Sequence, residues 1–339
     1  MSSENTAKVK FTERPLVKRI LASDYITLTG IICLIITFSI VVQIVNSNFL
    51  SPTNIINIGR QIVVYGILSC ALSFPMINGT FDISISSTAA LGGMMTALFI
   101  TDGLAGLTLP IPIAIIVSIL ACCVVGLVNG VIISYSSIPP FIVTLGTQTG
   151  VRGIVYLISN NKPIGGLPDG FLLLTSTDIG PIPIQIILML IVFVIVGFVL
   201  NRTSFGRKIY ANGGNYQAAF QSGIRVARVR TAAYVISAGL AAVAGILLTA
   251  RVGSAQPTAC NTYEGIAISS CAMGGVSLAG GSGMVTGVFF GAVMMGLLTN
   301  GMNLMRISSN WQWVVRGVLL IGAVFYSLWI TNRANRIKK

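Results

Sequence analysis

Long apolar segments separated by short polar ones make up most of this chain. A segment of about 20 apolar residues is needed to cross the hydrocarbon of a bilayer. Six segments are uniform enough to do so: Tyr25–Val45, Ile111–Ser134, Ile182–Leu200, Thr231–Ala250, Met284–Met305 and Trp313–Ile330. Three less uniform candidates are Ile62–Ile77, Ile83–Thr101 and Pro139–Ser159. The weakest, Ile266–Leu278, is too short for a straight crossing and is expected to be half-buried or broken. The pattern predicts an all-α polytopic membrane protein with about ten transmembrane segments.

Composition supports this fold class and narrows the chemistry. The 339 residues are 54% hydrophobic and only 9% charged, whereas soluble domains carry about 25% charged residues. The chain has no histidine, which excludes Ser-His-Asp catalysis and histidine metal ligation. Its six cysteines show no Cys-x-x-Cys spacing, so we interpret them as small packing residues. We therefore expect no catalytic residues and no metal site.

The basic residues predict the orientation of the chain. Lysine and arginine number 21 against eight acids, and they flank apolar segments, which favours a role in membrane orientation over nucleic-acid binding. Three basic segments belong on the cytoplasmic side: a tail at 1–24, a central loop at 201–230 and a tail at 331–339. Six membrane segments within 25–200 and four within 231–330 satisfy this condition, so both termini are expected to be cytoplasmic.

Two short stretches indicate an internal repeat. "ISSTAALGG" begins at Ile85 and follows Asp82, while "ISSCAMGG" begins at Ile268 and follows Glu264. If the second and seventh membrane segments correspond, the offset of five crossings inverts the topology. Two inverted five-helix repeats with broken helices are a transporter architecture. The alternative is coincidence among small residues in a biased sequence.

The central basic loop contains a predicted short helix. Asn215 is a favourable N-cap, and Gly223 suits a left-handed C-terminal stop. A helix of about two turns does not persist alone in water, so we expect it to dock on a partner and to transmit motion to its neighbours. Its expected contact residues are a pair of small residues and two aromatic anchors: Ala218, Ala219, Tyr216 and Phe220. The alternative is an ordinary basic connector.

The stretch "TSFGRKIYANGGNYQAAFQSGIRVARVR" resembles the cytoplasmic coupling segment of the ribose-type permease subunits of bacterial ABC importers. The positions that match the family's pattern are Thr203, Phe205, Gly206, Arg207, Gly213, Gly214, Asn215, Ala218, Ala219, Ser222, Gly223 and Ile224. "PPFIVTLGTQTGVRGIVYL" and "MGGVSLAGGSGMVTGVFFGA" are similar to two further family segments in the same order. Together these segments cover the chain from about Pro52 to Ile330. Two stretches depart from the family's pattern. "NGTFDISISS" lacks a glycine on each side of Asp82, and "YEGIAIS" lacks the second acid after Glu264.

The resemblance implies a permease that forms the pathway for a monosaccharide, a ribose-like pentose or a hexose, in the bacterial cytoplasmic membrane. Its implied partners are an ATP-binding-cassette ATPase, a periplasmic or lipid-anchored substrate-binding protein, and a second permease copy or a homologous permease, with membrane lipid around them. The residues implied to couple to the ATPase are Gly213, Gly214, Asn215, Ala218, Ala219, Ser222 and Gly223. Alternative cargoes are a nucleoside, a branched-chain amino acid or an autoinducer-type ligand; an ion-coupled secondary transporter is a further alternative.

The chain lacks the motif that binds ATP. No Gly-Lys-[Ser/Thr] sequence occurs, so there is no Walker A loop and the partner subunit is expected to use the ATP. We expect no cofactor on this chain. The glycine-rich "GGSGMVTG" lies in apolar surroundings, which favours close helix packing over nucleotide binding.

Asp82 is the most informative polar residue within the apolar segments. A carboxylate at the centre of a membrane costs about 2.5–3.5 kcal/mol on insertion scales, so it needs a function or a buried partner. Two interpretations remain: a structural pin on a helix break, or a hydroxyl-binding carboxylate in the pathway. Arg152 either pairs with Asp82 or extends to an interface. The candidates for the substrate pathway or the break are Asp82, Ser84, Asn129, Phe141, Thr144, Glu264 and Asn300. The alternative for the neutral ones is ordinary hydrogen bonding between helices.

Overall fold

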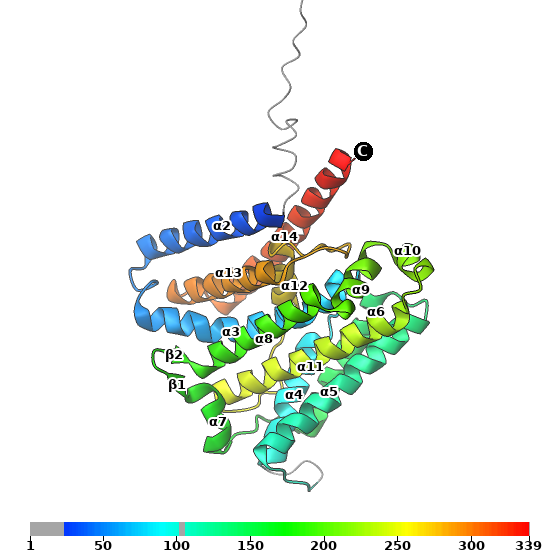
Figure 1. Ribbon diagram of the computed structural model, residues 1–339. Coiled ribbons are helices and arrows are strands. Elements are labelled where there is room, and N and C mark those ends of the chain that lie inside the picture. The colour runs from blue at the N-terminus through cyan, green and yellow to red at the C-terminus, as the bar shows by residue number, and fades with distance from the viewer. Residues whose placement is uncertain (1–23, 102–105, 339) are drawn as a thin grey trace, which may run out of the picture.

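The computed structural model describes residues 24–101 and 106–338 and is almost entirely helical (Figure 1). The elements are α2 (Asp24–Val45), α3 (Pro52–Ile77), α4 (Ile85–Ile100), α5 (Ile111–Tyr135), α6 (Pro140–Ile158), α7 (Asp169–Ser176), β1 (Asp178–Ile179), β2 (Ile182–Pro183), α8 (Ile184–Arg202), α9 (Ser204–Gly214), α10 (Tyr216–Gln221), α11 (Val226–Val252), α12 (Tyr263–Met273), α13 (Val285–Leu304) and α14 (Ser309–Lys338). β1 and β2 form a two-stranded antiparallel hairpin. The basic N-terminal tail, which was expected to be cytoplasmic, lies outside the described residues up to position 23.

Within the described residues, seven helices are long and apolar enough to cross a membrane: α2, α3, α5, α6, α8, α11 and α13. This confirms the all-α polytopic fold class. Two of the predicted segments correspond to shorter helices, because α4 has 16 residues and α12 has 11. At 1.5 Å per residue they are about 24 and 16 Å long, short of the ~30 Å hydrocarbon. The last predicted segment lies within α14, which has 30 residues.

Helices α3 and α11 extend further than their apolar patterns. α3 begins ten residues before the predicted Ile62, at Pro52, and the Ser51 side chain caps it by accepting a hydrogen bond from the Asn54 amide. α11 begins at Val226 and ends before Gly253, which has a left-handed φ of 73°. In the extension of α3, Asn54 bonds to Asn300 of α13 and Arg60 pairs with Asp178 of the hairpin. Polar residues interrupt the apolar pattern in both extensions. An apolar pattern alone therefore misses them.

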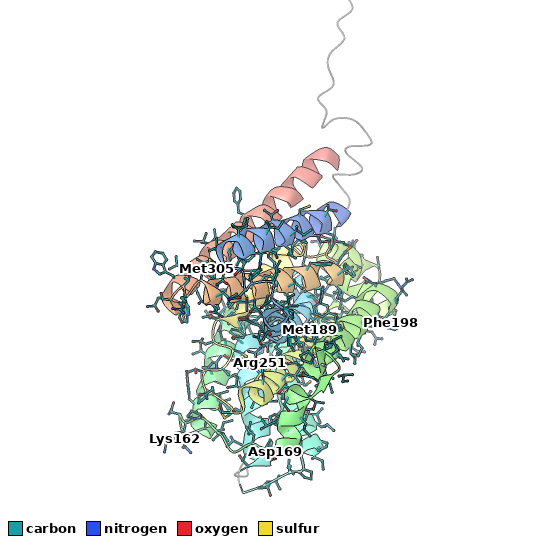
Figure 2. All side chains as sticks on the ribbon, turned by 90° about the vertical axis from the view of Figure 1, so that its left-hand side faces the viewer. Lys162, Asp169, Met189, Phe198, Arg251 and Met305 are labelled. Atoms are coloured by element: carbon teal, nitrogen blue, oxygen red, sulfur yellow. The ribbon has the colours of Figure 1, made fainter. Side chains whose placement is uncertain are left out.

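Helices α3 and α11 form the centre of the bundle and run antiparallel. Near the start of α3, the Arg60 carbonyl accepts a hydrogen bond of 2.6 Å from Arg251 at the end of α11. Just beyond the other end of α3, the Phe81 carbonyl accepts one of 2.9 Å from the Tyr234 hydroxyl. Tyr234 is fully buried. Met189 of α8 is buried in the middle of the packed side chains in Figure 2, whereas Lys162 and Asp169 lie at the edge.

The helices that follow α3 and α11 pack in the same way. α4 contacts α5, α6 and α11, and α12 contacts α13, α14 and α3. The four helices α3 to α6 therefore correspond to the four helices α11 to α14. The elements α7 to α10 lie between the two sets and have no part in this correspondence. Because the two central helices are antiparallel, this correspondence favours an inverted repeat over coincidence.

Small residues bring the helices into direct backbone contact. A Cβ on Gly245 of α11 would overlap the Ala89 carbonyl of α4, and a Cβ on Gly92 would lie 2.8 Å from the Ala242 Cα. In the second half, Gly287 and Gly274 approach equally closely. Such contacts are typical of helix packing in membranes. In the glycine-rich stretch, Gly287 packs against Gly274 as the sequence predicts, whereas Gly280, Gly281 and Gly283 lie in the turn before α13.

The two ends of the bundle carry different elements. Figure 1 shows the β1–β2 hairpin and α7 at one end, and α9 and α10 at the opposite end. The segment 201–230, expected as a loop, is thus largely helical and lies at a single end of the molecule.

Candidate functional site

Two short helices, α9 and α10, form the segment expected to couple to an ATPase. Asn215 caps α10 by accepting a hydrogen bond of 3.0 Å from the Ala218 amide, and the helix stops before Gly223, whose φ is 78°. Both features match the sequence prediction. The preceding helix α9 was not predicted. Its signals are Thr203, which caps it by accepting from the Gly206 amide at 3.1 Å, and the apolar pair Phe205 and Ile209 at helical spacing.

Ala218 and Ala219 were expected to form one small face of α10, but they do not lie on the same face. Ala219 is buried against its own chain with 4% of its surface exposed, whereas Ala218 is exposed. Consecutive helical residues point about 100° apart, so they rarely share one face. The exposed large side chains of α10 are its aromatic ones, Tyr216 at 52% and Phe220 at 65%. A docking surface on α10 can therefore include the aromatic residues and Ala218, but not Ala219.

An open groove of about 470 Å³ lies beside α10. Its lining includes the two aromatic residues of α10, the end of α5 and the start of α11: Tyr135, Tyr216, Phe220, Ile224, Arg225 and Arg228. The guanidinium of Arg230 lies 5.6 Å from the centre of the Tyr216 ring, within the range of a cation–π contact. The groove thus combines apolar surface with positive charge.

Three segments meet at the inner end of α9, in a contact that we call the glycine junction. It comprises the turn after α3 (residues 78–80), the end of α9 (residues 212–214) and the turn before α13 (residues 279–283). The amide of Gly281 donates a 2.8 Å hydrogen bond to the carbonyl of Ile77. The Asn212 amide group donates to the Asn78 side chain, and the Tyr210 hydroxyl donates to the Gly283 carbonyl at 2.8 Å. The junction therefore joins α9 to both halves of the bundle.

Glycine is required where these backbones touch. A Cβ on Gly213 would overlap the Ile77 carbonyl oxygen and lie 2.6 Å from the Gly281 nitrogen. A Cβ on Gly280 would lie 2.6 Å from the Cα of Gly79, and both of these glycines have positive φ angles. By contrast, a Cβ on Gly214 would meet only one atom, 3.9 Å away. Of the two glycines at the end of α9, only Gly213 is packed too tightly for a side chain.

Asp82 lies in the break between α3 and α4 and is 1% exposed. One carboxylate oxygen accepts from the Ser84 amide at 3.0 Å and from the Ser84 hydroxyl at 2.6 Å. The other accepts from the Ser237 hydroxyl of α11 at 3.2 Å. Arg152 does not pair with it, because its guanidinium donates to the carbonyls of Pro257 and Ala259. This geometry holds the break against α11.

The hydrogen bonds continue from Asp82 to α6. The Asn129 amide group of α5 donates to the Ser84 hydroxyl at 2.9 Å and accepts from the Thr147 hydroxyl of α6 at 2.6 Å. The resulting chain of side chains, which we call the Asp82 network, is Ser237, Asp82, Ser84, Asn129 and Thr147. It links α11, the helix break, α5 and α6.

Two other candidates also make hydrogen bonds within the protein, one inside a helix and one between two helices. Thr144 is buried and donates to the Pro140 carbonyl of its own helix at 3.0 Å. Asn300 of α13 and Asn54 of α3 exchange hydrogen bonds of 2.9 and 3.0 Å. Asp82, Ser84, Asn129, Thr144 and Asn300 thus bond within the protein. None of these five side chains lines the cavity described next.

A cavity of about 480 Å³ lies between α6, α12 and α14, beside Ile83 at the start of α4. Of the predicted pathway residues, it brings together Phe141 and Glu264. Four further residues that line it were not among the predicted site residues: Gln148, Thr262, Trp313 and Arg316. Trp313 and Arg316 lie three residues apart within a predicted membrane segment, where such spacing indicates one helix face. A charged residue within an apolar segment is unusual, so Arg316 was the sequence signal that could have indicated this site.

Comparison with known proteins identifies relatives over most of the chain. Residues 54–324 match the family described as the permease component of branched-chain amino acid transport systems. The ribose import permease protein RbsC of Bacillus subtilis is 38% identical over 84% of this chain and 88% of its own length. The L-arabinose transport system permease protein AraH of Escherichia coli is 37% identical over 82% and 84% of the two chains. The D-allose transport system permease protein AlsC of the same species is 35% identical over 81% and 83%. No solved structure matches the chain.

Proposed function

The chain belongs to the family of permease components of branched-chain amino acid transport systems, and we propose that it forms the translocation pathway for a monosaccharide in an ATP-driven importer. It is a multi-pass protein of the bacterial inner membrane. The three relatives named above import ribose or transport L-arabinose and D-allose. A pentose or hexose is therefore the cargo class that we propose.

The proposed partners follow from the division of labour in such importers. An ATP-binding subunit supplies the energy, since this chain has no Walker A sequence. A substrate-binding protein outside the membrane delivers the sugar. A second permease, identical or homologous, completes the pathway. The chain itself binds no cofactor in this scheme, and both of its termini are cytoplasmic.

The single observation that carries the proposal is the glycine junction. Closure of the ATP-binding subunit displaces α10 and with it α9. The junction passes that displacement to the turn after α3 and to the turn before α13 through backbone contacts. One turn lies in each half of the bundle, so a single displacement acts on both halves. Relative motion of two repeats around a central site is the basis of alternating access.

The proposal is tested by reconstituting the permease with its ATP-binding subunit and binding protein in proteoliposomes. Uptake of radiolabelled ribose, L-arabinose and D-allose is measured with ATP inside or outside the vesicles. We expect uptake of at least one sugar only when ATP is available to the ATP-binding subunit. Uptake that persists without ATP while an ion gradient is held would indicate an ion-coupled carrier instead.

The cargo class is tested in the same vesicles. L-leucine and a nucleoside are offered beside the three sugars, each with the matching binding protein. Selective uptake of the amino acid or the nucleoside would retain the importer but contradict the sugar as cargo.

A further inference from the structure

The cavity between α6, α12 and α14 lies where both short helices begin. Ile83 precedes α4, and Glu264 lies in the first turn of α12. Tyr263 at the start of α12 packs on Tyr65 in the middle of α3, with the ring centres 5.1 Å apart. The Phe81 carbonyl just before α4 is bonded to Tyr234 within α11. The N-terminal ends of both short helices therefore lie at membrane depth. Lining residues of α14 complete the cavity from the second half of the chain. The cavity is therefore lined by elements of both halves, at the level where a cargo crosses.

Two charged side chains of opposite sign line this cavity without pairing. Where the structure describes the side chains, the ion pair formed joins Arg60 of α3 to Asp178 of the exposed hairpin, at 3.3 Å. In the same part of the chain, Oε2 of Glu264 and Nε of Arg316 are buried atoms with no hydrogen-bond partner. Buried polar atoms are almost always hydrogen-bonded in proteins. These two atoms therefore indicate a ligand that both donates and accepts.

The remaining lining is mostly apolar, with two neutral polar groups. Phe141 and Trp313 supply aromatic surface, and Gln148 and Thr262 supply a neutral amide and a hydroxyl. Apolar walls with a few placed polar groups are typical of small-molecule sites of about 300–1,000 Å³. A sugar fits this lining because each hydroxyl both donates and accepts, while the ring carbons pack on apolar surface.

We propose that this cavity is a binding station for one neutral sugar, in which Glu264 accepts hydrogen bonds from its hydroxyls and Arg316 donates to them. This inference rests on the proposed function and deepens it by assigning the residues that hold the cargo. The opposite charges exclude strongly charged cargo, because an anion meets Glu264 and a cation meets Arg316. A zwitterionic amino acid satisfies both charges as well, so the test must separate it from a sugar.

The test uses the complete importer in proteoliposomes and the sugar that the wild type takes up best. Glu264→Gln and Arg316→Gln remove one charge each and leave a neutral amide in its place. We expect each variant to lower sugar uptake at least ten-fold, whereas ATP hydrolysis stimulated by the loaded binding protein changes less than two-fold. Asp178→Asn on the exposed hairpin is the matched charge-removal control and should leave both rates unchanged.

A second readout separates binding from a structural role. Monodeoxy analogues of the sugar are offered to each assembled variant. The wild type should discriminate against the analogue that lacks the hydroxyl bound by Glu264, and Glu264→Gln should lose that discrimination. If a glutamine variant does not assemble with the ATP-binding subunit, the same analogues are offered to Glu264→Asp and Arg316→Lys instead.

Three results would overturn the binding station. The first is wild-type uptake and selectivity in both glutamine variants. The second is an equal loss of uptake and of stimulated ATP hydrolysis, which indicates coupling rather than binding. The third is selective uptake of L-leucine that depends on Arg316. A wild type that takes up no sugar with ATP would instead contradict the proposed function itself.

Discussion

The carbonyl of Ile77 accepts a 2.8 Å hydrogen bond from the amide of Gly281, although the two residues lie in opposite halves of the sequence. Gly213 of α9 packs against both partners of this bond. The coupling segment thus lies at the point where the two halves of the bundle are joined. Because α9 contacts both halves there, a movement of α9 displaces both.

The glycine junction predicts a difference between two neighbouring glycines. Gly213→Ala places a methyl group on the Ile77 carbonyl, whereas Gly214→Ala meets only one atom at 3.9 Å. We expect the first variant to lose about 1–3 kcal/mol of stability, as overpacked sites do, and to lose coupling. Thermal unfolding of the purified permease and binding-protein-stimulated ATP hydrolysis measure the two effects. Equal behaviour of the two variants would show that the junction is not tightly packed.

The aromatic residues of α10 are predicted to contact the ATP-binding subunit. Phe220→Ala should weaken association by about five-fold or more, because exposed aromatic anchors contribute about 1 kcal/mol or more at interfaces. Phe198→Ala is the control, since Phe198 is 62% exposed against 65% for Phe220 but lies on the membrane helix α8. Association is measured by co-purification in detergent. Retained association in both variants would assign the docking surface elsewhere.

Ala219→Asp should act differently from a change at the exposed surface. Ala219 is 4% exposed, so the variant buries an unpaired carboxylate within the permease, which costs several kcal/mol. We expect a lower yield of folded protein even without the ATP-binding subunit. Ala218→Asp, at the exposed neighbour, should fold normally. Fluorescence-detected size exclusion measures the folded fraction, and equal yields would contradict the burial of Ala219.

Asp82→Asn tests the pin on the helix break. Asparagine replaces one acceptor oxygen by an amide donor, which then faces either Ser84 or Ser237, whose hydroxyls donate to Asp82. We expect a loss of about 1–3 kcal/mol in stability and a nearly unchanged KM for sugar uptake. Asp169→Asn, at an exposed position at the start of α7, is the control. A variant of Asp82 that assembles normally but no longer transports would place Asp82 in the pathway.

Orientation is tested by labelling introduced cysteines with an impermeant maleimide. Asn212 is unsuitable as a probe position because it is buried, but Gln217 is exposed on α10 and Lys162 is exposed at the opposite end. In a background without native cysteines, Lys162→Cys should react in intact cells and Gln217→Cys only after permeabilisation. The reverse pattern would invert the orientation and remove α10 from the reach of a cytoplasmic ATPase.

Helices with an uninterrupted apolar pattern were predicted most closely. The predicted bounds of the segments at α2, α5 and α13 differ from the observed ones by at most one residue at either end. This holds for α2 and α5, which are mostly exposed, and for α13, which is mostly buried within the protein. α3 was predicted ten residues too short since Asn54 bonds to Asn300 rather than to water. The helix α9 was missed because it is amphipathic and lies between apolar segments.

The site was harder to predict than the fold because its contacts join distant residues. Local pattern identified Asn215 as a cap, since its partner is three residues away. It identified Asp82 as unusual but left its partner open, because Ser237 belongs to a helix in the other half. The glycine junction was not predicted at all, because the sequence around a glycine does not indicate which distant backbone segment it will contact.

The glycine junction also has a consequence for how the protein is made. Asn212 and Gly213 leave the ribosome long before Gly281, whose amide completes the contact with Ile77. Until then, α9 and α10 can contact only the part of the bundle that precedes Gly281 in the chain. The link from α9 to the second half of the bundle is therefore completed only after residue 281 has been synthesised, and a shorter chain lacks the contact through which the ATP-binding subunit acts on that half.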